Sequence, residues 1–237
     1  MHTLTGTHSR MDWMEALEHE ARSLVEELEA HPTARRLFDG SIDTAGYTRY
    51  LVQAYHYVRW TTPLLTESGE RMKRSGSHSA LGALFLHKAA EERGHERWLL
   101  SDLKNLGWPA ERVTAAGRCP AVNAYISWNR YTTLVGIPLA FLGTAYVLEY
   151  LAERRAPRAV ERLLAARNIP NIHKAVTFLR GHGEADGGHV AELTRLLRSM
   201  TDPREQSALL LSARTTRSLY LGLFSSDARK APEHATS

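Results

Sequence analysis

The chain has 237 residues, of which 43% are hydrophobic and 24% are charged, so it is long enough to bury a full-sized core and has the composition of an ordinary globular protein. Its 30 Lys and Arg and 26 Asp and Glu residues give a net charge of only +4, and the two signs are interspersed along the sequence, which argues against a nucleic-acid partner. The single cysteine, Cys119, excludes an internal disulfide and a cysteine-based zinc or iron–sulfur site.

The two ends of the chain are polar, and we expect a single domain between them, over residues 11–226. Residues 1–10 lack a charged segment followed by an apolar one, so we expect a flexible lead and a cytoplasmic location. Residues 227–237 have a composition typical of disorder. The longest apolar run, 134–148, is too short to cross a bilayer, so we expect no membrane partner.

Apolar residues recur every three or four positions through most of the chain, and no segment alternates with period two, which predicts an all-α fold. His31-Pro32 should end the first helix, Pro63 should kink a long one, and Gly107 to Pro120 reads as a loop. The predicted helices cover residues 11–30, 32–37, 44–74, 81–106, 122–133, 138–155, 160–166, 178–200 and 207–224.

Polar residues interrupt the apolar stripes of two of these helices. In the 81–106 helix, Lys88, Glu92 and His95 take positions between Phe85 and Leu99. In the 178–200 helix, the inward positions between Leu179 and Leu193 hold His182, Asp186 and His189. Burying such groups costs several kcal/mol unless they are paired, and a metal bound by nitrogen and oxygen ligands is an economical partner.

The spacing of these residues favours a shared metal over a set of unrelated polar groups. Glu92-x-x-His95 and Asp186-x-x-His189 each place an acid and a histidine on one helical face, as in four-helix di-metal sites. Chance alone supplies about one such pair in a chain with this many acids and histidines, so their position within the core stripes is the stronger argument. The alternative is a buried network of salt bridges among the same four residues.

A di-metal site of this kind needs two further carboxylates from two other helices. Glu149, the first charge after a long apolar stretch, is one candidate. On the 44–74 helix the inward positions hold His56 and Arg59 instead of an acid, and we keep both as additional candidates. Lys88 would act there as a charge partner or proton donor, and Tyr55 as a contact for the substrate.

Four segments, YLVQAYHYVRW, EERGHERWLLSDLKNLG, LGTAYVLEYL and HGEADGGH, resemble the haem-oxygenase-like di-iron oxidases, also described as iron-containing redox enzymes. The likeness covers roughly residues 35–225, and its most specific part is His182-x-x-x-Asp186-x-x-His189. Several members carry a further glutamate where Arg59 stands in this chain, and others carry one where Lys88 stands. These two departures weaken the expected second iron site.

The resemblance implies a single-domain haem-oxygenase-like bundle of about seven main helices. It also implies an oxidase or oxygenase that uses Fe(II), up to two ions per chain with the second weakly held, and O2 as co-substrate. An external electron donor and a small amino-acid- or fatty-acid-like substrate would be its partners, and the reaction would be N-oxygenation, desaturation or C–C cleavage, as in natural-product biosynthesis. The chain could form a homodimer.

Three other functions remain open from the sequence. A thiaminase-II-like hydrolase shares a YLxQDYxYL segment, but Ala54 replaces its aspartate and Cys119 would have to be the nucleophile. A true haem oxygenase would use His19 on the first helix and would leave the core carboxylates unexplained. A metal-free helical binding protein of the same fold would explain why Arg59 and Lys88 stand at positions where members of the family carry glutamates.

Overall fold

The computed structural model describes residues 12–76, 78–184 and 188–224, and all regular structure in these ranges is helical. The all-α prediction is therefore confirmed. The α-helices are α1 (Trp13–Ala30), α2 (Pro32–Phe38), α3 (Thr44–Val58), α4 (Thr61–Ser75), α5 (Ser79–Glu91), α6 (His95–Asn105), α7 (Ala110–Ala115), α8 (Pro120–Leu134), α9 (Phe141–Ala166), α10 (Thr177–Glu184), α11 (His189–Arg198) and α12 (Pro203–Tyr220). Short 3-10 helices cover Pro138–Ala140 (η1), Ile172–Lys174 (η2) and Leu221–Phe224 (η3).

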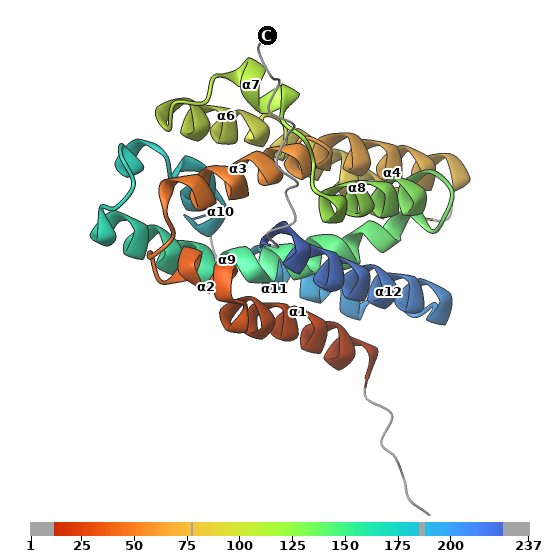
Figure 1. Cartoon of the computed structure of the whole chain (residues 1–237). Helices are drawn as coiled ribbons and strands as arrows, with labels where there is room; N and C mark the ends of the chain where they lie inside the picture. The colour runs from red at the N-terminus through yellow and green to blue at the C-terminus, as the bar shows by residue number, and fades with distance from the viewer. Residues whose placement is uncertain (1–11, 77, 185–187, 225–237) are drawn as a thin grey trace, which may run out of the picture.

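The longest helix, α9, runs through the middle of the molecule (Figure 1). It packs against α1 and α2 on one side and against α10, α11 and α12 on others, while α3, α4 and α8 lie above it in the view of Figure 1, with α6 and α7 above them. Gly143 allows α12 to come close, because a Cβ at this position would lie 2.1 Å from the carbonyl oxygen of Leu209. Side chains of α9 therefore reach the centre of the bundle.

The first helix boundary is where the sequence predicts it. His31 separates α1 from α2, and its Nδ1 accepts hydrogen bonds from the backbone N–H groups of Thr33 and Ala34. Pro32 takes the first position of α2, where a missing N–H costs nothing. None of the helices in the described ranges combines the length and apolar character that a membrane-spanning segment needs.

Three predicted long helices are divided in the structure, and the positions of the breaks were not predicted. The 81–106 helix stops at Glu91 and restarts at His95, because Gly94 adopts a left-handed conformation with φ 98°. The 178–200 helix is divided into α10 and α11. The 44–74 helix breaks at residues 59–60 instead of kinking at Pro63, which lies in the first turn of α4, where no intrahelical N–H bond is lost.

In two places the chain is more helical than predicted. The predicted helices 138–155 and 160–166 are joined, since α9 runs from Phe141 to Ala166 and continues through Pro157, while Pro138–Ala140 forms η1. The ring of Pro157 lies against Gly183 of α10, where a Cβ would be 3.0 Å from the proline Cδ. Helix α7 occupies part of the segment predicted as a loop. Packing of α9 against its neighbouring helices outweighs the tendency of Pro157 to break the helix.

Candidate metal centre

A cavity of about 410 Å³ lies in the interior between α9 and the helices α3, α5, α6, α10 and α11. This volume is within the range of small-molecule sites, about 300–1,000 Å³. Most of its lining side chains are aliphatic or aromatic. The lining also includes ten polar or charged residues: Thr61, Lys88, Glu91, Glu92, His95, Thr144, Glu149, Arg155, His182 and Glu192.

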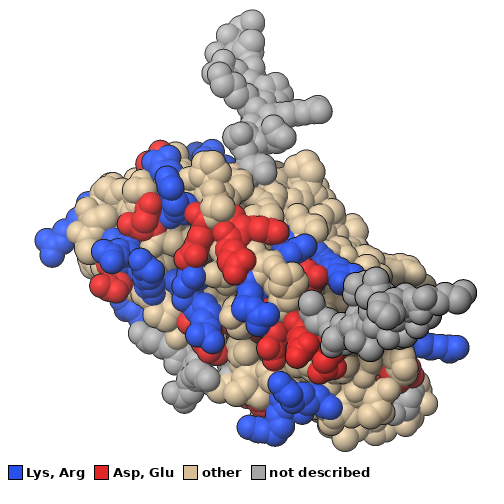
Figure 2. Space-filling view, turned by 90° about the horizontal axis from the view of Figure 1, so that it is seen from below, with Lys and Arg blue, Asp and Glu red and all other residues tan. Residues whose placement is uncertain are grey.

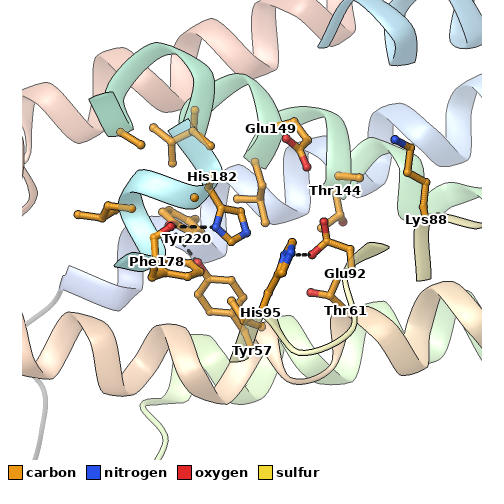
Figure 3. Close-up of a pocket in the computed structure, with 18 of the residues that line it drawn as sticks. Tyr57, Thr61, Lys88, Glu92, His95, Thr144, Glu149, Phe178, His182 and Tyr220 are labelled. Atoms are coloured by element: carbon orange, nitrogen blue, oxygen red, sulfur yellow. Dashed lines mark hydrogen bonds and ion pairs between the residues drawn. The ribbon is translucent and has the colours of Figure 1, made fainter. Parts of the chain in front are cut away.

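Three potential metal ligands converge in this cavity. One ligand atom from each of Glu92, His95 and His182 lies within 4.8 Å of the other two. Glu92 follows the last residue of α5, His95 is the first residue of α6, and His182 comes from α10 (Figure 3). The break at Gly94 therefore lies inside the cluster, and it positions the acid-x-x-His pair that the sequence assigned to one continuous helix.

Hydrogen bonds orient both imidazoles. His182 Nδ1–H donates to the carbonyl oxygen of Phe178 at 3.0 Å, which leaves Nε2 with the lone pair that a metal requires. His95 Nδ1 lies 2.9 Å from Glu92 Oε2. Burial lowers the pKa of His182, and the charge of His95 adds to this, although the Phe178 carbonyl and Glu92 act in the opposite direction. His182 is consequently neutral at neutral pH, which is the ligating form.

Trp98 covers the histidine pair, and the sequence analysis missed it. Its ring stacks on His95 with centroids 4.0 Å apart and an interplanar angle of 20°, and it meets the edge of His182 at 5.7 Å. Gly181 makes room for it, because a Cβ there would lie 2.6 Å from the indole. The spacing of Trp98 three positions after His95 was the available signal, since such residues share one face of a helix.

Glu149 and Lys88 line the same cavity but lie outside this three-residue cluster. Glu149 projects from α9 toward the space beside His182 (Figure 3), and its negative charge acts to raise the pKa of His182. Lys88 Nζ forms ion pairs with Glu91 at 3.0 Å and with Glu192 at 3.3 Å. Burial would lower the pKa of Lys88, but these two carboxylates outweigh it and raise that pKa, so Lys88 is held as a cation.

Two predicted ligands cannot be placed. Asp186 lies outside the described residues. His189 is the first residue of α11, and its side chain also lies outside what the structure describes. Both remain predictions.

Tyr55 and His56 of α3, and Arg59 directly after it, are not among the residues that line the cavity. Tyr55 contacts His56 edge to face at 5.5 Å, and the Arg59 guanidinium lies 5.8 Å from the Tyr55 ring centre. His56 is 4% exposed, and burial, followed by the charge of Arg59, lowers its pKa. Tyr57 lines the cavity instead, with its hydroxyl 3.3 Å from that of Tyr220. Two positions along a helix lead to nearly the opposite face, so Tyr55 and Tyr57 cannot both point into the cavity.

The donor set fits a non-haem iron ion. Two imidazoles and one carboxylate are the ligands that Fe(II) takes in sites with open coordination positions. The set contains no thiolate, because Cys119, the one cysteine of the chain, is not among the residues that line the cavity. Glu92, His95 and His182 would hold the ion, with Glu149 beside them.

The comparisons with known proteins agree with this architecture. A family model described as "Iron-containing redox enzyme" matches residues 48–221. A solved structure of a domain of unknown function with a haem-oxygenase-like fold, from Shewanella denitrificans OS217, has a TM-score of 0.76 at 20% identity, with 91% of each chain covered. A TenA homologue from Pseudomonas syringae pv. tomato str. DC3000 has a TM-score of 0.70 at 14% identity, with 94% of this chain and 96% of that chain covered.

None of the curated proteins matches this sequence. The two structures show the fold, and the family model covers the segments that carry Glu92, His95, Glu149 and His182. The chain adopts the haem-oxygenase-like fold and belongs to the iron-containing redox enzyme family.

Proposed function

We propose that the protein is a non-haem iron-dependent oxidase or oxygenase that uses O2 to oxidise a small amino-acid- or fatty-acid-like substrate. The observation that carries this proposal is the convergence of Glu92, His95 and His182 in an apolar cavity of ligand size. Bound there, Fe(II) would supply the activation of O2 and the oxidising power. An external donor would supply electrons, and a second iron would be weakly held beside Glu149, Asp186 and His189.

The residues of the chain have three tasks in this function. The hydrogen bond from His182 to the Phe178 carbonyl and the pair between His95 and Glu92 orient the imidazoles. The aromatic and aliphatic lining excludes water from the reacting atoms. The hydroxyls of Tyr57 and Tyr220 offer hydrogen bonds to a bound substrate, in the role that the sequence analysis gave to Tyr55.

The positions of His19 and Cys119 argue against the haem oxygenase and hydrolase alternatives. His19 is exposed on α1, and neither it nor Cys119 belongs to the residues that line the cavity. A haem ligand or a nucleophile at those positions would act outside the pocket. The metal-free binding protein remains the competing function, because it requires only the cavity.

Anaerobic titration with ferrous iron, followed by metal analysis of the desalted protein, tests the proposal. We expect one tightly bound ion per chain and a second that is lost on dilution. Wild type that retains less than half an equivalent would favour the metal-free binding protein. Oxygen uptake by the iron-loaded enzyme with candidate substrates then tests the redox function directly.

Matched variants identify the ligands in the same assay. His95→Ala, His182→Ala and Glu149→Ala should each lower the iron content, and so should Asp186→Ala and His189→Ala if the predicted ligand set is complete. His87→Ala is the control, because its side chain is 68% exposed and pairs with Glu91 on the surface of α5. Equal iron content in His87→Ala and His182→Ala would reject the site.

A further inference from the structure

The wall of the cavity reaches solvent at two glutamates. Glu91 is the last residue of α5 and Glu192 lies in the first turn of α11, and both line the cavity. Their side chains are 46% and 48% exposed. Among the described residues that line the cavity, only these two are exposed, and the others are buried or half-buried. A side chain that borders both the cavity and bulk solvent marks the opening between them.

Lys88 lies across this opening. Its Nζ is 3.0 Å from Glu91 Oε2 and 3.3 Å from Glu192 Oε2, so one ammonium group connects α5 with α11. The two helices pack mainly against other partners, α5 against α4 and α11 against α9. Side chains therefore span the distance between α5 and α11 at this point. We refer to Lys88, Glu91 and Glu192 together as the entrance.

The charges of the entrance hold the ammonium group in place. Burial acts to lower the pKa of Lys88, but its contacts with the two glutamates outweigh this and raise that pKa, so the group stays charged at neutral pH. His87 Nε2 lies 3.2 Å from the second oxygen of Glu91, Oε1, and orients this carboxylate. The hydrocarbon part of a lysine can cover apolar surface while its charged end reaches solvent. Lys88, which lines the cavity and is 26% exposed, is placed to do so.

Ion pairs of this kind are weak enough to break often. Partly exposed pairs contribute little to stability, because water and salt screen them. The ammonium group leaves the entrance only when both of its pairs are broken. Passage of a small molecule through the entrance is therefore possible, but it is slower than passage through a permanently open one.

We propose that Lys88 controls access to the cavity, because its ion pairs with Glu91 and Glu192 close the entrance and a small molecule passes only when they break. Lys88 thereby acts at the opening of the cavity, which differs from the proton donor predicted from the sequence. The inference concerns access to the site of the proposed oxidase. It requires no iron, so it applies to the metal-free protein.

Stopped-flow fluorescence of the metal-free full-length chain tests this role. The probe is N-phenyl-naphthylamine, a neutral dye that fluoresces in apolar surroundings. In Lys88→Met, which keeps an unbranched side chain and removes its charge, the association and dissociation rates should both rise about fivefold or more. The dissociation constant should stay the same, because a closed entrance slows both directions equally. A lysine that contacts the dye would instead change the dissociation constant.

Three further variants separate the entrance from other effects. Glu192→Gln removes the pair between α5 and α11 and should also raise both rates. Lys88→Arg keeps a cation within reach of both carboxylates and should retain rates close to those of wild type. Arg198→Gln is the matched control, because Arg198 of α11 pairs with Glu18 of α1 at 3.6 Å and neither residue lines the cavity. It should leave both rates unchanged.

Salt tests the same contact without a substitution. At about 1 M sodium chloride the screening length falls to about 3 Å, which weakens the two ion pairs. Both rates of wild type should then approach those of Lys88→Met at low salt. The rates of Lys88→Met should not depend on salt, since this variant has no ammonium group at the entrance.

Three results would overturn the proposal. These are equal rates in wild type and Lys88→Met, an equal acceleration in Arg198→Gln, or the absence of saturable dye binding in both wild type and Lys88→Met. Circular dichroism and thermal unfolding show whether each variant keeps the fold. The two proposals fail separately. Unchanged rates in a protein that binds iron would reject this inference alone, and faster rates in a protein that binds no iron would reject the redox function alone.

Discussion

Two of the polar regions in the described interior differ in how their hydrogen bonds are satisfied. In the first, Thr144 of α9 bonds Asn129 of α8 at 2.9 Å and Ser212 and Thr216 of α12 at 3.0 and 2.8 Å. All four residues are 0% exposed. These neutral groups satisfy one another, so the region joins three helices and needs no ligand.

The second region is the cluster of Glu92, His95 and His182, which consists of ionisable groups and opens onto the cavity. Within the part of the chain that the structure describes, its hydrogen bonds engage one nitrogen of each imidazole, Nδ1. Buried polarity alone therefore does not indicate function. A cluster of ligand atoms that converge beside a cavity does indicate a functional site.

Removal of a ligand should give the largest effect. In His182→Ala, the affinity for ferrous iron should fall by about 100-fold or more, the upper range of losses caused by outer-shell changes, because an inner ligand is lost. Equilibrium dialysis under anaerobic conditions measures this. An affinity within threefold of wild type would show that the cluster resembles the Thr144 network in being purely structural.

A change in the hydrogen-bond network around Thr144 should lower stability and leave iron binding intact. Asn129→Ala removes the partner of Thr144 and the donor to the Tyr125 carbonyl, so it should lower the free energy of unfolding by about 2 kcal/mol. Iron affinity should not change. Urea denaturation and the same dialysis assay provide the two measurements, and a loss of iron with full stability would contradict the assignment.

Displacing the Trp98 ring should have an intermediate effect on the affinity for iron. Gly181→Ala places a Cβ where the indole lies, 2.6 Å away, so the ring must leave the face of His95. We expect about a tenfold loss of iron affinity and a change in tryptophan fluorescence. Gly183→Ala is the control, because it changes helix propensity on the same helix but faces Pro157. Equal losses in both variants would assign the effect to α10 itself.

The smallest effect should be a pH dependence of stability in the metal-free protein. Burial lowers the folded-state pKa of His182 below its usual value of 6.5, so the unfolded chain binds more protons in this range. The stability is present above pH 6.5 and is lost as the pH falls through the folded pKa. His182→Asn should flatten this slope in thermal melts between pH 5 and 7. Burial also lowers the pKa of His56, so the His182→Asn variant should retain a weaker dependence of stability on pH.

One face of the molecule carries charges of mixed sign. Figure 2, viewed from below Figure 1, shows Lys and Arg mixed with Asp and Glu on one face instead of a patch of one sign. Some charges of the chain pair across helices, as Arg214 and Arg217 of α12 do with the buried Glu20 of α1. The chemistry that distinguishes this chain lies in its interior.

The sequence by itself determined the helical class and much of the candidate site. Periodicity of three to four residues predicts which face of a helix is buried, and polar residues on that face stand out against leucine. Glu92, His95 and His182 were identified in this way, and the structure brings them together. Glu149 was identified as the first charge of an apolar helix, and it lines the same cavity.

Only the tertiary structure decided where the helices break and what surrounds the ligands. Gly94 in the left-handed region divides a helix at the site, whereas Pro157 fails to divide α9. Tyr57 instead of Tyr55 lines the cavity, and Trp98 of α6 meets His182 of α10, a helix distant in sequence. Periodicity specifies the inward face of one helix, but the space enclosed depends on how several helices pack, and local sequence does not encode that packing.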